Sequence, residues 1–255
     1  MGQAVIRALE PVSNAELSFA LTAPTSPYLA HDASELAGLK GSGVALTAST
    51  KTALKTCDVL IDFSTPKATL DTAIAMHDTY CQTLVTGTTG YTQSEEDALL
   101  KAAENITLLR SGNFSLGVNL LEALVEKAAT ALGTDWDIDV LEMHHRHKID
   151  SPSGTAFMLG EAAARGRDVK LSDVSQFTRI GRDSQRKEGE IGFAVLRGGG
   201  VVGDHEVRIA NELEMLTLSH RAFDRSVFAE GAVAAALWAA DMPKGLYTLR
   251  DMLGV

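Results

Sequence analysis

The chain has 255 residues, with 45% hydrophobic and 22% charged residues, which is the balance of a globular protein of one large or two modest domains. Its formal net charge of −10 argues against nucleic acid or an anionic membrane as a partner. No apolar run approaches the roughly 18 residues that span a bilayer. Cys57 and Cys81 are too few for a disulfide framework, so we expect buried thiols and a cytoplasmic protein.

The first half of the chain alternates predicted strands and helices. The expected helices cover 2–10, 68–77 and 94–103, and the expected strands cover 16–21, 59–64, 82–86 and 106–110. Pro66 suits a helix start, and Ser94 and Asp97 have capping-box spacing. This alternation predicts a parallel, doubly wound sheet whose ligands bind beyond the carboxyl ends of its strands.

The second half has a different pattern. We expect helices over 116–132 and 154–165, and strands over 137–143, 191–196, 207–210 and 215–219. The short connections between the last three strands predict antiparallel pairing. The polar segment between Asp168 and Gly189 is expected to be a mobile loop or lid. A last helix over 229–240 has an alanine-rich face and is expected to return to the first domain.

The densest group of reactive side chains runs from Glu142 to Thr155 and reads EMHHRHKIDSPSGT. His144 and Lys148 are four residues apart, which is about 6 Å on a helix but about 13 Å on a strand. Both can touch one small molecule only if the chain turns after Met143. The amides of the helix that follows Ser153 add an anion site, so the group predicts a receptor for one or two carboxylates with a titratable proton donor.

Two other interpretations of this group stay open at this point. It could be a solvated strand end with no function. It could also be a zinc site of His144, His145 and His147, although adjacent strand residues point to opposite faces and the cations Arg146 and Lys148 would repel a metal. We therefore expect no metal.

Two glycine-rich segments are candidates for a dinucleotide-binding loop, and the sequence around them favours only the second. Residues 198–203 fit the G-x-G-x-x-G pattern, but a strand follows where a dinucleotide site needs a helix, so we interpret them as a turn. Residues 87–90, Gly-Thr-Thr-Gly, end a predicted parallel strand and could contact a ribose or a nicotinamide.

Taken together, these segments resemble the 4-hydroxy-tetrahydrodipicolinate reductase (dihydrodipicolinate reductase) family along nearly the whole chain. The most specific matches are HHRHK at 144–148 and SPSGTA at 151–156. Supporting matches are the segments 59–64, 87–90, 113–119, 197–199 and 202–205. The resemblance implies a Rossmann-like parallel-sheet domain over 1–114 and 225–255. It also implies an α+β substrate-binding and oligomerisation domain with a mainly antiparallel sheet over 115–224.

The resemblance also implies residue roles. His144 would be the proton donor and acceptor, and Lys148 the proton donor. The substrate carboxylates would be held by His145, Gly154 and Thr155. The nicotinamide end of NADPH or NADH would be lined by Gly87, Thr88, Thr89, Ser111, Gly112, Asn113 and Phe114. The implied reaction is hydride transfer to the cyclic dicarboxylate of lysine and diaminopimelate biosynthesis, in a homotetramer.

Two departures from the family pattern bear on the cofactor. Family chains begin with a strand and a glycine-rich loop that ends in Gly-Arg-Met-Gly, and Met1-Gly2 matches only the end of that loop. As written, the chain is expected to lack that strand and to bind the dinucleotide weakly. Thr22-Ala23-Pro24 stands where the family often has an acidic residue or an arginine, so neither NADH nor NADPH is favoured.

Three rival functions remain at this stage. One is a related Rossmann oxidoreductase that acts on another dicarboxylate or imine, and another is a truncated, non-catalytic paralogue. A metal-dependent hydrolase is the third.

Overall fold

The structure is a computed structural model that describes residues 1–182 and 184–255. The chain divides into two units, and each is described by itself. The first comprises Met1–Ser115 and Ser226–Gly254, and the second comprises Leu116–Arg225 with Val255.

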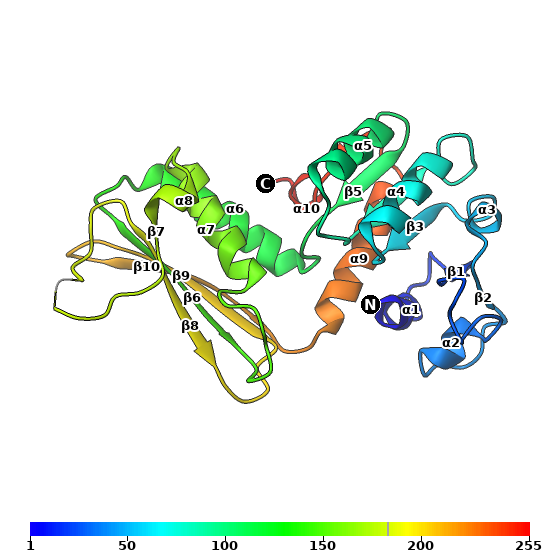
Figure 1. Ribbon diagram of the computed structural model, residues 1–255, viewed down its shortest axis with the longest axis horizontal. Coiled ribbons are helices and arrows are strands. Elements are labelled where there is room, and N and C mark those ends of the chain that lie inside the picture. Colours follow the sequence, from blue (N-terminus) through cyan, green and yellow to red (C-terminus); the bar gives the residue numbers. More distant parts are fainter. Residues whose placement is uncertain (183) are drawn as a thin grey trace. The chain divides into compact units, whose positions relative to one another are not determined.

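The first unit is built on a four-stranded parallel sheet in the order β11-β5-β4-β3. Its strands β3 and β5 are labelled in Figure 1. Its strands are β3 Val59–Asp62, β4 Thr83–Thr86, β5 Thr107–Arg110 and β11 Gly245–Tyr247. Its larger helices are α1 Gly2–Leu9, α4 Pro66–Ala75, α5 Gln93–Ala103 and α9 Ser226–Ala239, and shorter ones are α2 Ala33–Leu36, α3 Thr50–Ala53 and α10 Leu249–Leu253.

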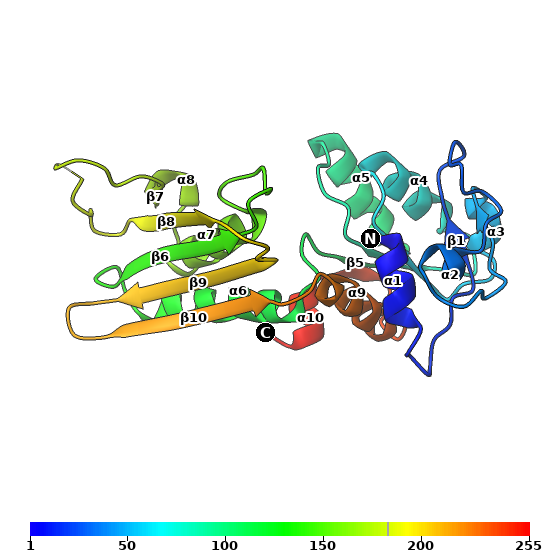
Figure 2. The same ribbon diagram turned by 90° about the horizontal axis from the view of Figure 1, so that it is seen from below.

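Helices cover both faces of this sheet, as the sequence pattern predicted. Figure 2 shows α4 and α5 on one side of β5 and α9 on the other. Leu84, Leu99 and Leu108 are fully buried in the core beneath α4 and α5. Both cysteines are free thiols and buried. Helix α9 packs on β3, β4 and β5. Its Gly231 approaches the loop so closely that an added Cβ would lie 1.8 Å from the Phe114 carbonyl oxygen.

Helix starts in this unit follow from local capping. Thr65 accepts a hydrogen bond from the Ala68 amide, with Pro66 next in the first turn. The capping box of α5 is formed by Thr92 and Glu95. The predicted box of Ser94 and Asp97 was wrong, because the helix begins earlier and places Ser94 inside its first turn.

The strand predicted over 16–21 is shorter than expected. Only β1, Ala20–Leu21, forms, and it pairs in parallel with β2, Leu46–Thr47, in a separate two-stranded sheet. An apolar segment becomes a strand only where a neighbour satisfies its backbone groups, and the pairing with β2 extends over two residues.

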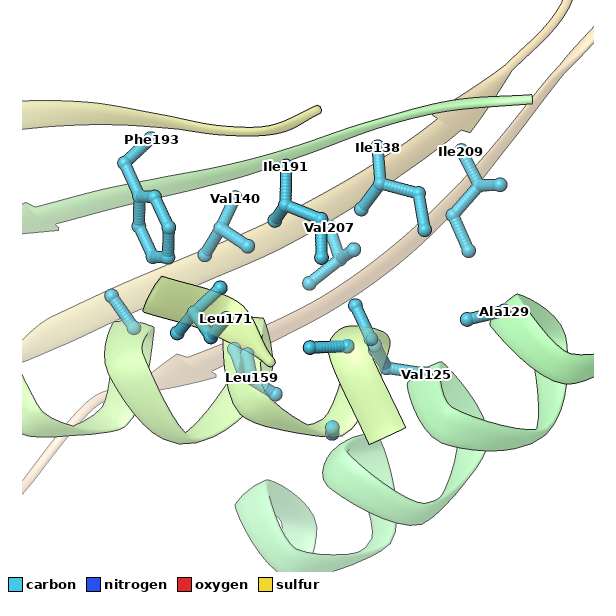
Figure 3. Packing of buried hydrophobic residues seen from close by; sticks show 14 of the residues in the cluster. Val125, Ala129, Ile138, Val140, Leu159, Leu171, Ile191, Phe193, Val207 and Ile209 are labelled. Atoms are coloured by element: carbon cyan, nitrogen blue, oxygen red, sulfur yellow. The ribbon is translucent and has the colours of Figure 1, made fainter. Parts of the chain in front are cut away.

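The second unit is a five-stranded sheet in the order β10-β9-β6-β8-β7. Its strands are β6 Asp137–His144, β7 Ser175–Gln176, β8 Ile191–Arg197, β9 Gly203–Ala210 and β10 Met215–Ala222. Its helices are α6 Leu116–Ala131, α7 Gly154–Gly166 and α8 Leu171–Val174. Apolar side chains from one face of the sheet, such as Ile138 and Val207, pack against Val125 of α6 and Leu159 of α7 (Figure 3).

The pairing in this sheet is mixed. The predicted antiparallel arrangement is confirmed for β9, which pairs with β10 on one side and β6 on the other. It was wrong for the segment 191–196, because β8 pairs with β6 in parallel. The physical reason is the crossover through α7, which returns the chain to the same end of the sheet.

The segment between Asp168 and Gly189 is more ordered than the loop that the sequence suggested, although Asp183 lies outside the described residues. It contains α8 and β7, and two of its arginines, Arg179 and Arg186, are tied to β6. Arg186 Nη1 lies 2.6 Å from Asp139 Oδ2, and Arg179 Nη1 lies 3.3 Å from Asp139 Oδ1. Within the described part of the chain, no helix has both the length and the apolar character needed to cross a membrane.

Candidate active site

The chain turns immediately after His144, the last residue of β6. The Lys148 amide donates to the His145 carbonyl at 3.1 Å, which closes a four-residue turn. The His145 amide donates to the Val201 carbonyl at 2.7 Å, so the glycine-rich turn between β8 and β9 supports this one. The turn required for His144 and Lys148 to serve one small molecule is therefore present, and residues 198–202 form the connection predicted for them.

His144 is held from inside the protein by a buried carboxylate. Its Nδ1 lies 2.6 Å from Glu142 Oε2, and the two side chains share the inner face of β6 because they are two residues apart on a strand. Glu142 is 3% exposed and His144 8%. The interpretation of this segment as a solvated strand end fits Arg146 and His147, which are exposed, but it was wrong for His144.

Arg197, at the end of β8, completes this group. It donates to both Glu142 oxygens, at 2.7 and 2.9 Å, and the Ser153 amide donates to Glu142 Oε1 at 3.0 Å. Burial raises the pKa of Glu142, but the hydrogen bonds from Arg197, His144 and Ser153 outweigh it and hold that pKa below its usual range. Glu142 is therefore a carboxylate at neutral pH.

Lys148 is connected to the start of α7. Its Nζ lies 2.8 Å from Asp150 Oδ1, and the Arg197 guanidinium donates to the Asp150 carbonyl at 2.8 Å. Ser153 caps α7 by accepting from the Ala156 amide at 3.1 Å. Gly154 begins the helix in open space, since an added Cβ would meet nothing within 4 Å. Lys148 and Arg197 therefore both reach Asp150, four residues before the start of α7.

His145 lies beside a cation that the sequence analysis did not single out. Arg225 Nη2 lies 3.3 Å from His145 Nε2. Because a guanidinium is only a donor, Nε2 accepts and Nδ1 carries the ring proton. Partial burial and the charge of Arg225 lower the pKa of His145, so at neutral pH the ring is uncharged and lies next to a fixed positive charge.

A second buried histidine packs against His144. The ring of His205 on β9 is edge-on to that of His144, with centroids 5.0 Å apart. Its Nε2 lies 3.1 Å from Ser153 Oγ. Burial, followed by the charge of His144, lowers the pKa of His205 to about 4. Gly203 makes room for this pair, because a Cβ there would lie 3.2 Å from His144 Nε2.

Four residues of this site were not predicted from the sequence: Glu142, Arg197, His205 and Arg225. One local signal could have indicated Glu142, namely its two-residue spacing from His144 on a strand that buries that face. Arg197 and His205 lie on other strands, and only the sheet brings them to the site. Among the described residues, no three His, Cys, Asp or Glu side chains have the arrangement of a metal site.

The first unit has its own group of predicted residues, at the carboxyl ends of β3, β4 and β5. These strands are in register, with Asp62 opposite Thr86 and Thr86 opposite Arg110. The Gly87 amide donates to the Asp62 carbonyl at 2.9 Å, and the Ser111 amide to the Thr86 carbonyl at 3.2 Å. The turn 87–90 and the loop 111–114 therefore leave the sheet side by side.

A buried carboxylate holds the turn 87–90. Asp62 Oδ2 accepts the hydroxyls of Thr69, Thr86 and Thr88, the last two at 3.1 and 3.2 Å. Thr88 is thus turned inward, and its amide also donates to Thr86 Oγ1. Thr89, which is exposed, is the side chain of this turn that a ligand can reach.

The loop 111–114 is locally braced. Ser111 Oγ donates to the Asn113 carbonyl at 2.7 Å, and Asn113 Oδ1 accepts from the Ser115 amide at 2.9 Å. Phe114 is buried edge-on against Phe63, with ring centroids 5.5 Å apart. The backbone of Gly112 is uncovered, because an added Cβ would approach only the Thr89 side chain, at 3.9 Å.

These features fit a nicotinamide dinucleotide. Parallel strands end at one edge, and the backbone of Gly90 and Gly112 there is open to a ligand. Gly90 has φ +86°, which suits a tight turn that only glycine adopts without strain.

The second unit also has a cavity of about 510 Å³. It is lined by Ser151, Pro152, Phe157, Phe177, Phe193 and Val195. None of these side chains carries a charge, and two of them, Ser151 and Pro152, belong to the loop 144–155.

Comparison with known proteins agrees along the whole chain. Residues 1–114 match the family described as "Dihydrodipicolinate reductase, N-terminus", and residues 117–253 match "Dihydrodipicolinate reductase, C-terminus". The 4-hydroxy-tetrahydrodipicolinate reductase of Parvibaculum lavamentivorans is 50% identical, over 100% of this chain and 94% of that protein. The enzyme of the same name from Brucella melitensis is 48% identical, over 100% and 95%.

Solved structures show the same fold. A dipicolinate-bound dihydrodipicolinate reductase from Paenisporosarcina sp. TG-14 has a TM-score of 0.78 at 22% identity, covering 99% of this chain and 94% of that one. An amine dehydrogenase from Mycobacterium smegmatis has a TM-score of 0.64 at 13% identity, covering 97% and 92%. With both halves of the chain matched and relatives at half identity, the protein belongs to the dihydrodipicolinate reductase family.

Proposed function

We propose that this protein reduces 4-hydroxy-tetrahydrodipicolinate to tetrahydrodipicolinate in lysine and diaminopimelate biosynthesis, the activity named for its relatives at about half identity. The observation that carries the proposal for this chain is the buried His144. It lies at the end of β6, is fixed by Glu142, and is followed by a turn that carries Lys148 toward the start of α7. This arrangement offers a proton donor beside an anion site.

The substrate carboxylates are held, in this proposal, by His145, Gly154 and Thr155, with Arg225 adding positive charge. A helix N-terminus and neighbouring cations stabilise an anion without moving, because their dipoles and charges are already oriented. His145 serves as a neutral donor, and the open backbone at Gly154 admits an oxygen to the first amides of α7. The neighbour from Paenisporosarcina, which binds dipicolinate, supports a planar dicarboxylate as ligand.

NADPH or NADH, when bound, supplies a hydride to C4 of the dehydrated ring. The residues proposed to line its nicotinamide end are Gly87, Thr88, Thr89, Ser111, Gly112, Asn113 and Phe114. Thr88 contributes to cofactor binding by fixing the shape of the turn, because its hydroxyl is hydrogen-bonded to Asp62. His144 and Lys148 deliver the proton that neutralises the charge developing on the ring.

We also propose a homotetramer joined through the sheets of the second unit. The sheet face opposite α6 and α7 carries Met143 paired across strands with Leu196, which is 59% exposed. Light scattering of the purified protein tests this assembly. The two free, buried cysteines are compatible with a reducing cytoplasm.

The experiment that tests the function is oxidation of NADH and NADPH with freshly generated 4-hydroxy-tetrahydrodipicolinate, in the parent chain, His144→Gln and Lys148→Ala. Activity in the parent that both substitutions abolish, with circular dichroism unchanged, supports the proposal. Absence of activity in a folded parent that still binds dipicolinate would favour a non-catalytic paralogue. Turnover only with a different dicarboxylate or imine would favour a related oxidoreductase.

A further inference from the structure

We infer that Glu142 is a positioning residue that fixes His144 in one tautomer, with the proton on Nδ1, and so makes Nε2 the atom that exchanges the proton with substrate. The inference rests on the proposed function for its catalytic consequence. Its structural basis is the 2.6 Å contact between His144 Nδ1 and Glu142 Oε2, formed inside the protein where both side chains are buried.

The tautomer follows from the chemistry of the two groups. An ionised carboxylate has only acceptor atoms, so the ring nitrogen that contacts it must carry a hydrogen. All four short contacts of Glu142 come from donors: His144 Nδ1, the two Arg197 nitrogens and the Ser153 amide. With Nδ1 occupied in this way, proton exchange is left to Nε2.

The position of Nε2 is set as firmly as its protonation. Nε2 lies over Gly203, where a Cβ would come within 3.2 Å. The ring of His205 packs edge-on against that of His144, and His205 is itself tied to Ser153 Oγ at 3.1 Å. His144 is therefore held by β6 through Glu142 and by β9 through His205, and it can turn only by breaking the Glu142 contact.

Arg197 keeps the carboxylate itself from moving. Two parallel hydrogen bonds fix the plane of a carboxylate as well as its distance, and the bonds from Arg197 Nη1 and Nη2 reach both Glu142 oxygens. The Ser153 amide adds a third fixed donor from the start of α7. The charged and titratable groups that contact the His144–Glu142 pair thus come from β8 (Arg197) and β9 (His205).

Glu142 could instead only brace the fold, by joining β6 to β8 and to α7. The two roles predict different results. A brace affects stability and substrate binding alike. A positioning residue affects the proton-transfer step, so kcat falls while KM and the affinity for an inert dicarboxylate stay unchanged.

The test compares Glu142→Gln with Asp139→Asn as a matched control. Asp139 lies three residues earlier on β6, on the opposite face, and is also bonded to an arginine, with Arg186 Nη1 at 2.6 Å. For Glu142→Gln we expect kcat to fall roughly 10²-fold, the lower end of the range for general acid–base catalysis. KM and the Kd of dipicolinate should change less than about twofold. Asp139→Asn should leave all three constants near those of the parent.

A second measurement needs no variant and keeps the inference testable if Glu142→Gln fails to fold. Nitrogen-15 spectra of the histidine rings report which nitrogen carries the proton, and the His144 signals are assigned by their loss in His144→Gln. We expect neutral His144 to be protonated at Nδ1 in the parent. A parent ring protonated at Nε2, or a folded Glu142→Gln with unchanged kcat, would overturn the inference. A parent that shows the Nδ1 tautomer but reduces no substrate would contradict the proposed function instead.

Discussion

The Lys148 ammonium lies 2.8 Å from the Asp150 carboxylate, so the cation proposed to serve the substrate already has an anionic partner in its own loop. The hydrogen bond from Lys148, with smaller contributions from the Lys148 charge and the Gly154 backbone, holds the pKa of Asp150 below its usual range. Asp150 is therefore charged throughout the neutral range. It lies where Lys148 and the start of α7 converge, which is also where a substrate carboxylate is proposed to bind.

This contact predicts that Asp150 competes with the substrate. In Asp150→Asn, KM and the Kd of dipicolinate should both decrease. The Asp150 side chain is 58% exposed, and exposed pairs contribute only about 0–1 kcal/mol, so the decrease should be at most about fivefold. Calorimetric titration with dipicolinate measures it. Weaker binding in the variant would show that Asp150 orients Lys148 for the ligand and does not compete with it.

Buried His205 predicts a stability that depends on pH. Burial lowers its pKa in the folded protein to about 4, from the usual 6.5 of a histidine. Between these values the unfolded chain binds the proton and the folded chain does not, so the free energy of unfolding decreases as pH falls from about 6.5 toward 4. From pH 7 to pH 5 this one group should remove about 2 kcal/mol.

The measurement is urea unfolding of the parent and of His205→Gln at both pH values. The glutamine variant lacks the titrating ring, so its loss between pH 7 and pH 5 should be smaller by about 2 kcal/mol. His147→Gln, which removes an exposed histidine of the same unit, is the control and should keep the parent's slope. Equal slopes in all three proteins would mean that His205 takes up its proton readily in the folded state.

Gly154 offers a way to separate a structural glycine from a functional one. A Cβ at Gly154 would meet nothing within 4 Å, and the residue begins α7. Gly154→Ala should therefore fold at least as stably as the parent, because alanine loses less backbone entropy in a helix. If a substrate carboxylate approaches this backbone, the added methyl should raise the Kd of dipicolinate tenfold or more, which corresponds to about 1.4 kcal/mol. Parent-like affinity would remove Gly154 from the site.

The sequence alone predicted the first unit's strand order along the chain better than the second unit's strand pairing. The succession from β3 to β5 was predictable because each element carries a local signal, such as Pro66 at a helix start or the apolar run Val59-Leu60-Ile61 of β3. The parallel pairing of β8 with β6 was not, since it depends on where the chain crosses the sheet after α7. The short β1 shows the same limit, because its length is set by a partner 26 residues away, with Ala20 opposite Leu46.

The site shows the same division. His144, Lys148 and Gly154 lie within one segment, and a dense local pattern predicted them together. Glu142 lies in the same segment, but the sequence predicted no role for it. Its position is fixed by Arg197, which is 55 residues away in the sequence. Thr88 was predicted from its place in a turn, but the sequence could not show that its hydroxyl faces the buried Asp62 and not a ligand.

We expect Thr69 to affect cofactor binding indirectly, through its contact with the Asp62 carboxylate. The Thr69 hydroxyl on α4 contacts Asp62 and lies 3.0 Å from Thr88 Oγ1, so it joins the helix to the turn proposed to line the nicotinamide. Thr69→Val keeps the side-chain shape but leaves buried polar groups without that partner, at a cost of about 1–3 kcal/mol. With the turn loosened, the Kd for NADH or NADPH should rise several-fold, measured by fluorescence titration.

Thr79→Val is the matched control, because the Thr79 hydroxyl donates only to the backbone of Met76 and Cys81 in the same unit. A loss of stability in both variants with weaker cofactor binding only in Thr69→Val would support the connection, and equal cofactor affinities would disprove it.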